Sequence, residues 1–223
     1  MKRIFTLACV AMLTLCASAQ VTFNAKLGGG MSWAPLSEKG DVDAFDNKGL
    51  FVGKVGFGAE IPVSQNFSVM PSLELAMKGG KYESKDDDET ISSKLNVTYL
   101  QIPVMAAYRL SLNDRLNMTL KAGPYFAYGL SGNMKTTSDY IGNETETEKI
   151  DIFSDKEMGG KAADRFDVGG ILGVDFEYHR FVFGAELECG FTDMYKRTET
   201  EEDWNYSAKI KNLAAYVTVG YKF

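Results

Sequence analysis

The chain ends on the stretch Tyr216-Val217-Thr218-Val219-Gly220-Tyr221-Lys222-Phe223, and these residues decide its fold. One parity carries Val217, Val219, Tyr221 and Phe223, whereas the other carries mostly small or polar residues. Alternation with a period of two predicts a β-strand with two different faces. The last residues of a soluble domain usually fray into water. A strand that ends on an aromatic residue therefore indicates an apolar environment at the very end of the chain.

The N-terminus carries the pattern of a secretion signal. Lys2 and Arg3 precede an apolar run over residues 4–15, and Ala17-Ser18-Ala19 forms an A-x-A cleavage site. Such a segment is too short to span a bilayer and predicts a cleaved signal peptide. We expect a signal peptide over residues 1–19 and a single domain over residues 20–223. A lipidated Cys16 is the weaker alternative, because bulky Leu15 stands where a small residue is needed.

The mature composition excludes some classes of function. Only Cys189 remains after cleavage, so no internal disulfide can form. Loss of Lys2 and Arg3 takes the formal net charge from −6 to −8, which argues against nucleic acid as a partner. No later apolar run is long enough for a membrane helix. The mildly polar composition suits a soluble protein, but it equally suits a transmembrane barrel, in which only alternate residues are apolar.

Eight segments repeat the alternation of the C-terminus, and in all of them the apolar parity lacks a charged side chain. They are residues 23–33, 51–61, 67–78, 100–109, 116–128, 166–178, 181–192 and 213–223. The connections at 62–66, 111–114 and 179–180 are short, and those at 35–47, 81–93, 131–162 and 196–207 are long and polar. Short turns at one end and long loops at the other are typical of outer-membrane barrels. The pattern predicts an all-β fold, an eight-stranded antiparallel up-and-down transmembrane β-barrel with periplasmic termini.

The main structural alternative is a soluble eight-stranded barrel with its apolar parity inside. Two features weigh against it. The apolar parity is dense in large side chains, for which a barrel of this size has little interior room. Aromatic residues also gather near the predicted strand ends, where a membrane barrel has its interfacial girdles; they include Trp33, Tyr108, Tyr128, Tyr178, Phe181, Tyr221 and Phe223.

The chain resembles bacterial outer-membrane porin family proteins, and in architecture the small barrels of the outer-membrane protein X and A type. The resemblance extends over the mature chain and is carried by residues 99–104, 123–129, 166–170 and 219–223. It implies insertion by the outer-membrane assembly machinery, with Tyr221 and Phe223 as the assembly signal. It also implies outer-membrane lipids and lipopolysaccharide as surroundings. The resemblance supplies no activity, because such proteins share a fold rather than a function.

The polar parity predicts a charged lumen, with basic residues on the earlier strands and acidic residues mostly on the later ones. Its members are Lys26, Lys54, Glu60, Glu74, Lys78, Arg109, Lys121, Asp167, Asp175, Glu177, Glu186 and Glu188. Across a narrow lumen these side chains would pair, because an isolated charge in a low-dielectric wall is costly. Eight strands enclose little more than their own side chains, so we favour a plugged interior. A narrow channel for small solutes or ions is the alternative.

Candidate chemistry is sparse. The only histidine, His179, falls in a predicted turn, so we expect neither enzyme activity nor a cofactor. The acidic runs at 86–89 and 199–203 have oxygens that could collect Ca²⁺ or Mg²⁺, but solvated loops are the favoured interpretation. Pro71, Pro103 and Pro124 each remove a ladder donor and predict local bulges. We therefore expect a monomeric barrel with a structural or surface-interaction role through its long acidic loops.

Overall fold

The computed structural model describes residues 21–38, 46–86, 89–140, 146–154, 163–201 and 204–223. The predicted signal peptide at residues 1–19 lies outside these ranges. Within them, no helix is long and apolar enough to cross a membrane.

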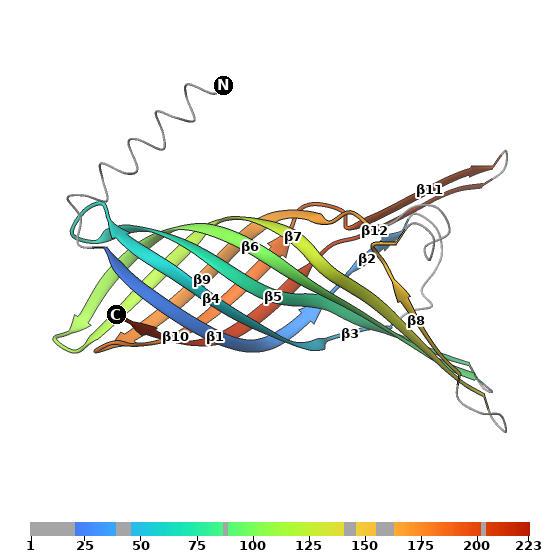
Figure 1. The fold of residues 1–223 in the computed structure, drawn as a ribbon, viewed down its shortest axis with the longest axis horizontal. Helices are drawn as coiled ribbons and strands as arrows, with labels where there is room; N and C mark the ends of the chain where they lie inside the picture. Colours follow the sequence, from blue (N-terminus) through green and yellow to red (C-terminus); the bar gives the residue numbers. More distant parts are fainter. Residues whose placement is uncertain (1–20, 39–45, 87–88, 141–145, 155–162, 202–203) are drawn as a thin grey trace.

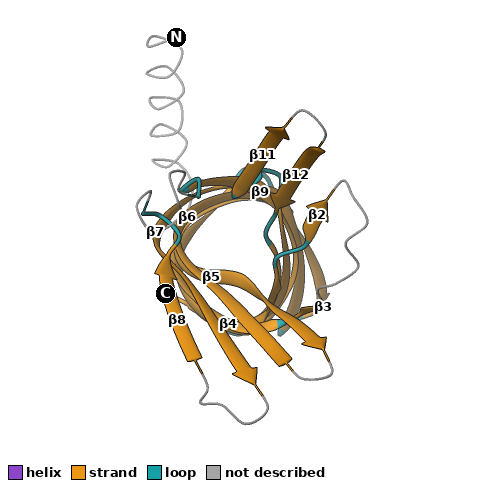
Figure 2. Cartoon of the chain, turned by 90° about the vertical axis from the view of Figure 1, so that its right-hand side faces the viewer, coloured by secondary structure: helices purple, strands orange, loops and turns teal. Residues whose placement is uncertain are grey.

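Eight strands form a closed antiparallel barrel, which confirms the predicted fold class (Figures 1 and 2). They are β1 (Thr22–Trp33), β4 (Leu50–Pro62), β5 (Phe67–Asp86), β6 (Glu89–Asn113), β7 (Leu116–Tyr140), β9 (Phe166–Tyr178), β10 (Phe181–Gly190) and β13 (Leu213–Lys222). Each strand pairs with the next, and the terminal strand β13 pairs back with β1, with Leu27 opposite Val219. We call the end with the tight turns at 63–66, 114–115 and 179–180 the turn end, and the opposite end the hairpin end.

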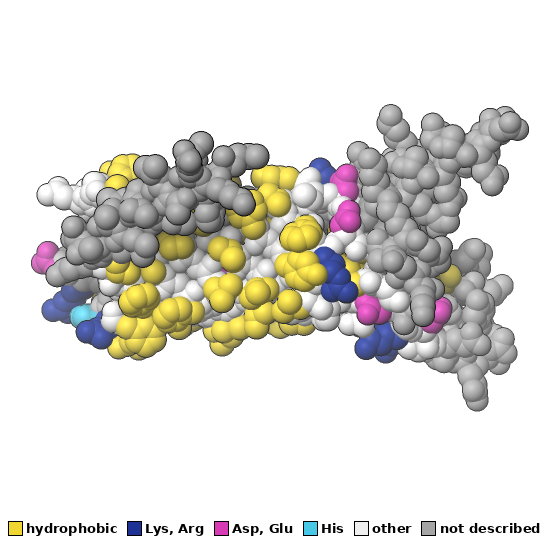
Figure 3. Space-filling view, turned by 45° about the horizontal axis from the view of Figure 1, so that its top comes forward, with side chains coloured by type: hydrophobic (Ala, Val, Ile, Leu, Met, Phe, Trp, Pro, Cys, Tyr) yellow, Lys and Arg dark blue, Asp and Glu magenta, His cyan; other side chains and the backbone are white. Residues whose placement is uncertain are grey.

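The apolar parity faces outward, as the membrane interpretation requires. Phe51, Leu172 and Val217 keep 76%, 62% and 69% of their surface exposed. In the space-filling view, hydrophobic side chains spread along the face of the barrel wall that is turned to the viewer (Figure 3). A soluble barrel would bury these residues, because exposure of so much apolar surface to water is unfavourable. The soluble alternative is therefore rejected.

The long polar connections are largely β-structure, which corrects the prediction of loops there. The strands β5, β6 and β7 continue past the barrel wall, and two short strands pair with these extensions: β3 (Asp46–Lys48) with β5 and β8 (Glu146–Asp151) with β7. A separate three-stranded sheet is formed by β11 (Tyr195–Glu201), β12 (Trp204–Ile210) and β2 (Leu36–Glu38). The β5–β6 ladder runs to the Asp86–Glu89 pair, and β6 stays paired with β7 as far as Glu89 and Tyr140. Backbone pairing needs no apolar face, so a polar segment can continue a ladder that the barrel has begun.

The three prolines do not produce the predicted bulges. The register on β6 and β7 shifts at Thr98/Tyr99 and at Ser111/Asn113 instead. Near Pro71 the ladder with β6 omits two pairs, but the register is the same on both sides of the gap. A missing proline donor is thus accommodated by a local loss of pairing rather than by an inserted residue.

Two glycines are required by the close approach of neighbouring strands. A Cβ at Gly30 would lie 1.9 Å from the carbonyl oxygen of Ala215 on β13. Gly79 has a φ of +148°, and a Cβ there would lie 1.9 Å from the carbonyl oxygen of Leu95. Only a residue without a side chain fits these positions. Gly30 thus permits the close approach of β1 to β13, and Gly79 that of β5 to β6.

Candidate functional site

The strongest candidate for a functional site is the barrel interior, where all twelve charged residues of the predicted lumen network form ion pairs. These residues are Lys26, Lys54, Glu60, Glu74, Lys78, Arg109, Lys121, Asp167, Asp175, Glu177, Glu186 and Glu188. They come from β1, β4, β5, β6, β7, β9 and β10, so seven of the eight barrel strands contribute. The period of two places them inside, because each lies on the opposite parity from the lipid-facing residues.

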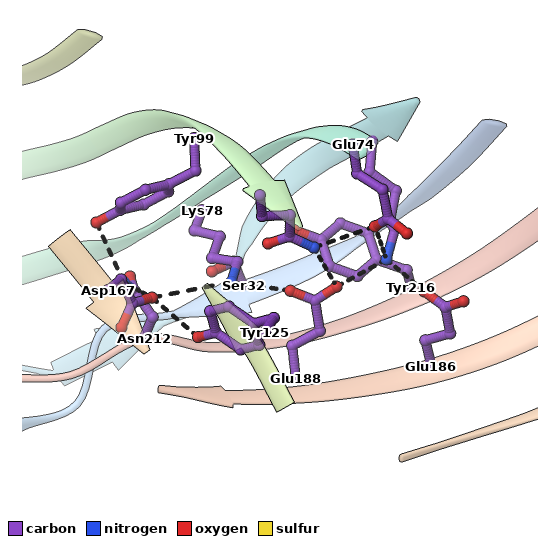
Figure 4. Close-up of polar contacts among 12 residues, drawn as sticks. Ser32, Glu74, Lys78, Tyr99, Tyr125, Asp167, Glu186, Glu188, Asn212 and Tyr216 are labelled. Carbon is purple, nitrogen blue, oxygen red and sulfur yellow. Dashed lines mark hydrogen bonds and ion pairs between the residues drawn. The ribbon is translucent and has the colours of Figure 1, made fainter. Parts of the chain in front are cut away.

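Lys54 is the centre of the network, and Figure 4 labels the three carboxylates that it contacts, Glu74, Glu186 and Glu188. Its ammonium contacts Glu186, lies 2.7 Å from Glu188 and lies 3.2 Å from Glu74, and its side chain is completely buried. The amide of Gln101 donates hydrogen bonds of 3.1 Å to both Glu74 and Glu188. One cation from β4 thus holds carboxylates from β5 and β10 together across the lumen.

Two further lysines complete the charge balance around Glu186. Lys26 lies 2.9 Å from Glu186 and 2.7 Å from Glu74. On the other side, Lys121 lies 2.8 Å from Glu186 and 2.6 Å from Asp175. Such buried pairs are favourable only when every charge finds a partner, and here the carboxylates share the ammonium groups.

A separate cluster closes the turn end. Arg109 lies 2.7 Å from Glu60 and 3.2 Å from Glu177, and Lys222 contacts the same two carboxylates. Lys222 was absent from the predicted network. Its position on the polar parity of the terminal strand was the available signal, because the same alternation that exposes Tyr221 turns Lys222 inward.

Towards the hairpin end, Lys78 connects the ion pairs to an aromatic layer. Its ammonium lies 2.8 Å from Glu188 and 3.8 Å from the ring centroid of Tyr125. The Tyr125 hydroxyl donates a hydrogen bond of 2.9 Å to Asp167. Asn212 donates to Asp167 at 2.9 Å and to the Tyr99 hydroxyl at 3.2 Å (Figure 4). Cation–π contact and charge-assisted hydrogen bonds both strengthen in such a desolvated setting.

Beyond this layer the interior is apolar, which corrects the prediction of a lumen that is polar throughout. A cluster of buried apolar residues begins beside the ion pairs, at Met105 and Ile171, and continues to the hairpin end; its other members are Ala34, Tyr82, Leu95, Val97, Tyr99, Tyr125, Ala127, Ile152, Ala163 and Met194. Ile152, Ala163 and Met194 come from connecting segments, and the Ala163 amide donates to the Ile152 carbonyl at 2.8 Å. We call this cluster the apolar cap. The apolar cap was not predicted, because Tyr82 and Ile152 fall in the predicted loops at 81–93 and 131–162, and Leu95 and Val97 fall in no predicted strand.

A small cavity lies at the polar level, towards the turn end. Its volume is about 30 Å³, and its lining includes Lys26, Lys121 and Lys222. This volume holds one or two water molecules. A water there would solvate the charged groups around it.

The geometry offers no favourable position for a metal ion within the described residues. Oxygens of Glu74, Glu186 and Glu188 lie within 4.8 Å of one another. The Lys54 ammonium already contacts all three, so a cation would have to displace a buried charge of the same sign. The side chains of the acidic runs at 86–89 and 199–203 lie outside the described residues.

The other predicted residues lie on the surface. His179 is exposed in the turn between β9 and β10, with a φ of 57° and its ring 4.5 Å from that of Tyr178. Tyr221 and Phe223 both face outward, and their rings meet edge to face at 5.5 Å. The Phe223 amide donates to the Phe23 carbonyl at 2.9 Å, so the final residue is tied to the first barrel strand.

Comparison with known proteins agrees with this architecture. The family described as outer membrane protein beta-barrel domain matches residues 18–196. None of the curated proteins matches the chain.

Solved structures of small barrels are similar in fold at low identity. OprG from Pseudomonas aeruginosa is 13% identical with a TM-score of 0.43, and the match covers 90% of this chain and 95% of that one. Neisserial surface protein A is 11% identical with a TM-score of 0.40, covering 90% and 97%. Ail of Yersinia pestis, solved with the heparin analogue sucrose octasulfate, is 14% identical with a TM-score of 0.37, covering 90% and 99%.

Proposed function

Because this chain belongs to the outer membrane protein β-barrel domain family, we propose that it acts as a plugged barrel of the bacterial outer membrane. Its role is structural or one of surface interaction rather than catalysis. Outer-membrane localisation follows from the family. The plugged interior and the surface role are the parts that we propose.

The observation that carries the proposal is the density of charged and apolar side chains inside the barrel. Lys222 joins the five cationic residues of the predicted network, and together they face seven carboxylates in two sets of ion pairs, one around Lys54 and one at the turn end. The apolar cap then covers the hairpin end. An ion that crossed this barrel would have to break buried ion pairs and pass through hydrocarbon side chains, both of which are costly. Eight strands also leave an interior that side chains alone can fill.

Single-channel recording in planar bilayers tests the plug. We expect the refolded mature barrel to be silent at voltages where a large porin conducts. The opposite result is a reproducible conductance that changes in Lys54→Gln, inside the lumen, but not in Lys211→Gln, at an exposed position outside it. That pattern would assign the current to this lumen rather than to a contaminating porin, and would favour the narrow channel.

The extended strands support a surface role. The β5–β6 and β6–β7 ladders continue as far as Glu89, well past the last outward-facing apolar residues of these strands. Ladders of this kind hold polar side chains in fixed positions away from the bilayer, which flexible loops would not do. In the sequence, the acidic run at 86–89 spans the connection between β5 and β6, and the run at 199–203 includes the connection between β11 and β12. Monomeric state, recognition of Phe223 by the assembly machinery and contact with lipopolysaccharide remain predictions.

A further inference from the structure

Five lysines form a row across five adjacent strands at the hairpin end. The cross-strand register pairs Lys48 with Lys81, Lys81 with Lys94, Lys94 with Lys135, and Lys135 with Lys149. Residues directly opposite each other in an antiparallel ladder project from the same face of the sheet. The five ammonium groups of β3, β5, β6, β7 and β8 therefore share one face, which we call the lysine row.

The lysine row lies on the outer face, continuous with the lipid-facing surface. On β5, Lys81 has the same parity as Met77, and on β6, Lys94 has the same parity as Ile102. Met77 and Ile102 belong to the exposed apolar band. Lys94 and its partner Lys135 are themselves exposed.

The row stands at the level of lipid headgroups. Four residues separate Met77 from Lys81, about 13 Å along a strand that is tilted to the membrane normal. Headgroups extend roughly 5–8 Å beyond the hydrocarbon on each side, and lysine stems reach back towards the interface. In Figure 1 the ends of β5, β6 and β7 slant away from the barrel axis, so their outer face overhangs the membrane beside the barrel. In Figure 3, basic side chains, with acidic ones among them, border the apolar band at this end.

Only part of the row is neutralised by the protein itself. Glu83 forms ion pairs with Lys48 and Lys81. Within the part of the chain that the structure describes, Lys94, Lys135 and Lys149 have no ion-pair partner. Like charges directly opposite each other destabilise a sheet. An anion placed between Lys94 and Lys135 would remove this repulsion.

On either side of the Lys94–Lys135 pair, the next residues on the same face are polar and uncharged. On the membrane side Asn96 is paired with Asn133, and on the tip side Ser92 is paired with Thr137. The one acidic neighbour on the membrane side is Asp151, opposite Asn133 at the β8 edge. Amide and hydroxyl groups around two lysines supply the donors and acceptors that a phosphorylated sugar requires.

We propose that the lysine row binds the phosphorylated sugar headgroup of an outer-leaflet lipid, with Lys94 and Lys135 on either side of a phosphate. The acyl chains of that lipid lie along the apolar band below. Outer-membrane barrels carry their longer loops on the extracellular side, so the hairpin end meets the outer leaflet. This inference is independent of whether the lumen is plugged. A soluble anionic polysaccharide could contact the same lysines, but it has no acyl chains to pack against the apolar band.

The test uses the mature barrel in nanodiscs of neutral phosphatidylcholine, titrated with bisphosphorylated lipid A and with lipid A stripped of its phosphates. Bound lipid is measured by native mass spectrometry. We expect Lys94→Gln/Lys135→Gln to weaken binding of bisphosphorylated lipid A by about 30-fold, the scale of two lysines at an anionic surface. Wild type should bind the dephosphorylated lipid as weakly as the variant does.

The matched control is Arg115→Gln/Arg180→Gln, which removes the same charge from two exposed residues at the turn end. We expect it to change binding by less than about threefold, because distant surface charges are screened. Heat-modifiable migration on gels verifies that both variants are folded. Equal losses in the two variants, or equal binding of both lipids by wild type, would overturn the proposal. The proposal would also fail if Lys94→Gln/Lys135→Gln lost binding of heparin fragments but kept its binding of lipid A, because the row would then recognise a soluble polysaccharide.

Discussion

At the scale of single residues, the interior depends on ammonium groups that each serve several carboxylates. Lys54 contacts Glu74, Glu186 and Glu188, and it also lies 4.7 Å from the ring centroid of Tyr216. These three carboxylates are buried and lie close together, so loss of the lysine that they share would leave negative charges facing one another away from solvent. The stability of the barrel should therefore respond strongly to its loss.

Replacement of Lys54 by Met tests this dependence. The substitution keeps the side-chain volume but leaves the three carboxylates with only their remaining lysine partners. Removal of one member of a buried ion pair costs about 3–5 kcal/mol. We expect the free energy of unfolding, measured by urea titration in detergent, to fall by about 3 kcal/mol for Lys54→Met. Exposed Lys211→Met should change it by less than about 0.5 kcal/mol, and Lys54→Met/Glu188→Gln should recover part of the loss. Equal small effects in all three variants would contradict a cohesive role for the network.

Glu83, in the hairpin beyond the apolar band, provides a test by pH. Hydrogen bonds from Lys48 and then Lys81 lower the pKa of its carboxyl to about 2. A carboxyl with a depressed folded pKa stabilises the fold above its ordinary pKa and loses that contribution as pH falls towards 2. We expect an NMR titration of Glu83 to show a midpoint near 2 in wild type. In Lys48→Gln/Lys81→Gln the midpoint should rise towards the ordinary glutamate range of about 4.3. An unchanged midpoint in that variant would show that the two lysines do not hold the charge.

Single residues also show which parts of the lumen network could be predicted from the sequence. Parity alone placed Lys54 and Glu186 inside, because a period of two assigns every residue to a face. Parity does not say which level of the lumen a residue occupies, so the grouping of Lys222 with Glu60 and Glu177 required the register. The link from Lys78 through Tyr125 to Asp167 required it as well.

At the scale of elements, each barrel strand has one face for lipid and one for the lumen. The outward face of β9 carries Leu172 and Phe176, while Asp175 points inward to Lys121. The barrel segments were predictable because hydrophobic alternation marks them directly. The extensions at 79–98 and 129–140 were not, since a ladder outside the bilayer needs no apolar parity and leaves no such mark.

Arginine on the two sides of this boundary tests the membrane face. Leu172 is 62% exposed on the apolar band, paired with Ala122 on β7. Arginine at a lipid-facing position near the bilayer midplane costs about 2–4 kcal/mol. We expect Leu172→Arg to lower the unfolding free energy in phospholipid vesicles by that amount. Thr137→Arg, in the β7 extension, should change it by less than about 0.5 kcal/mol. Equal tolerance at both positions would mean that the band faces water.

At the scale of the whole molecule, the barrel is polarised along its axis. The turn end is closed by Arg109 and Lys222 with their carboxylates, whereas the hairpin end carries the apolar cap and the lysine row. The alternation of short and long connections predicted this polarity in outline. It could not predict the cap, because the cap combines Leu95 and Ile152, which lie far apart in the sequence and inside segments that look like polar loops.

The polarity makes a prediction about orientation in the cell. Short turns of outer-membrane barrels stay in the periplasm, and longer connections cross to the outside. Cysteines at exposed Thr147 in β8 and at exposed Arg180 in the β9–β10 turn therefore report on opposite sides, once Cys189 is replaced by Ser. We expect a membrane-impermeant maleimide to label Thr147→Cys on intact cells and Arg180→Cys only after the outer membrane is permeabilised. If only Arg180→Cys were labelled on intact cells, the barrel would have the opposite orientation in the membrane. This orientation would also remove the lysine row from the outer leaflet, because the row lies at the same end as Thr147, two residues from Lys149 on β8.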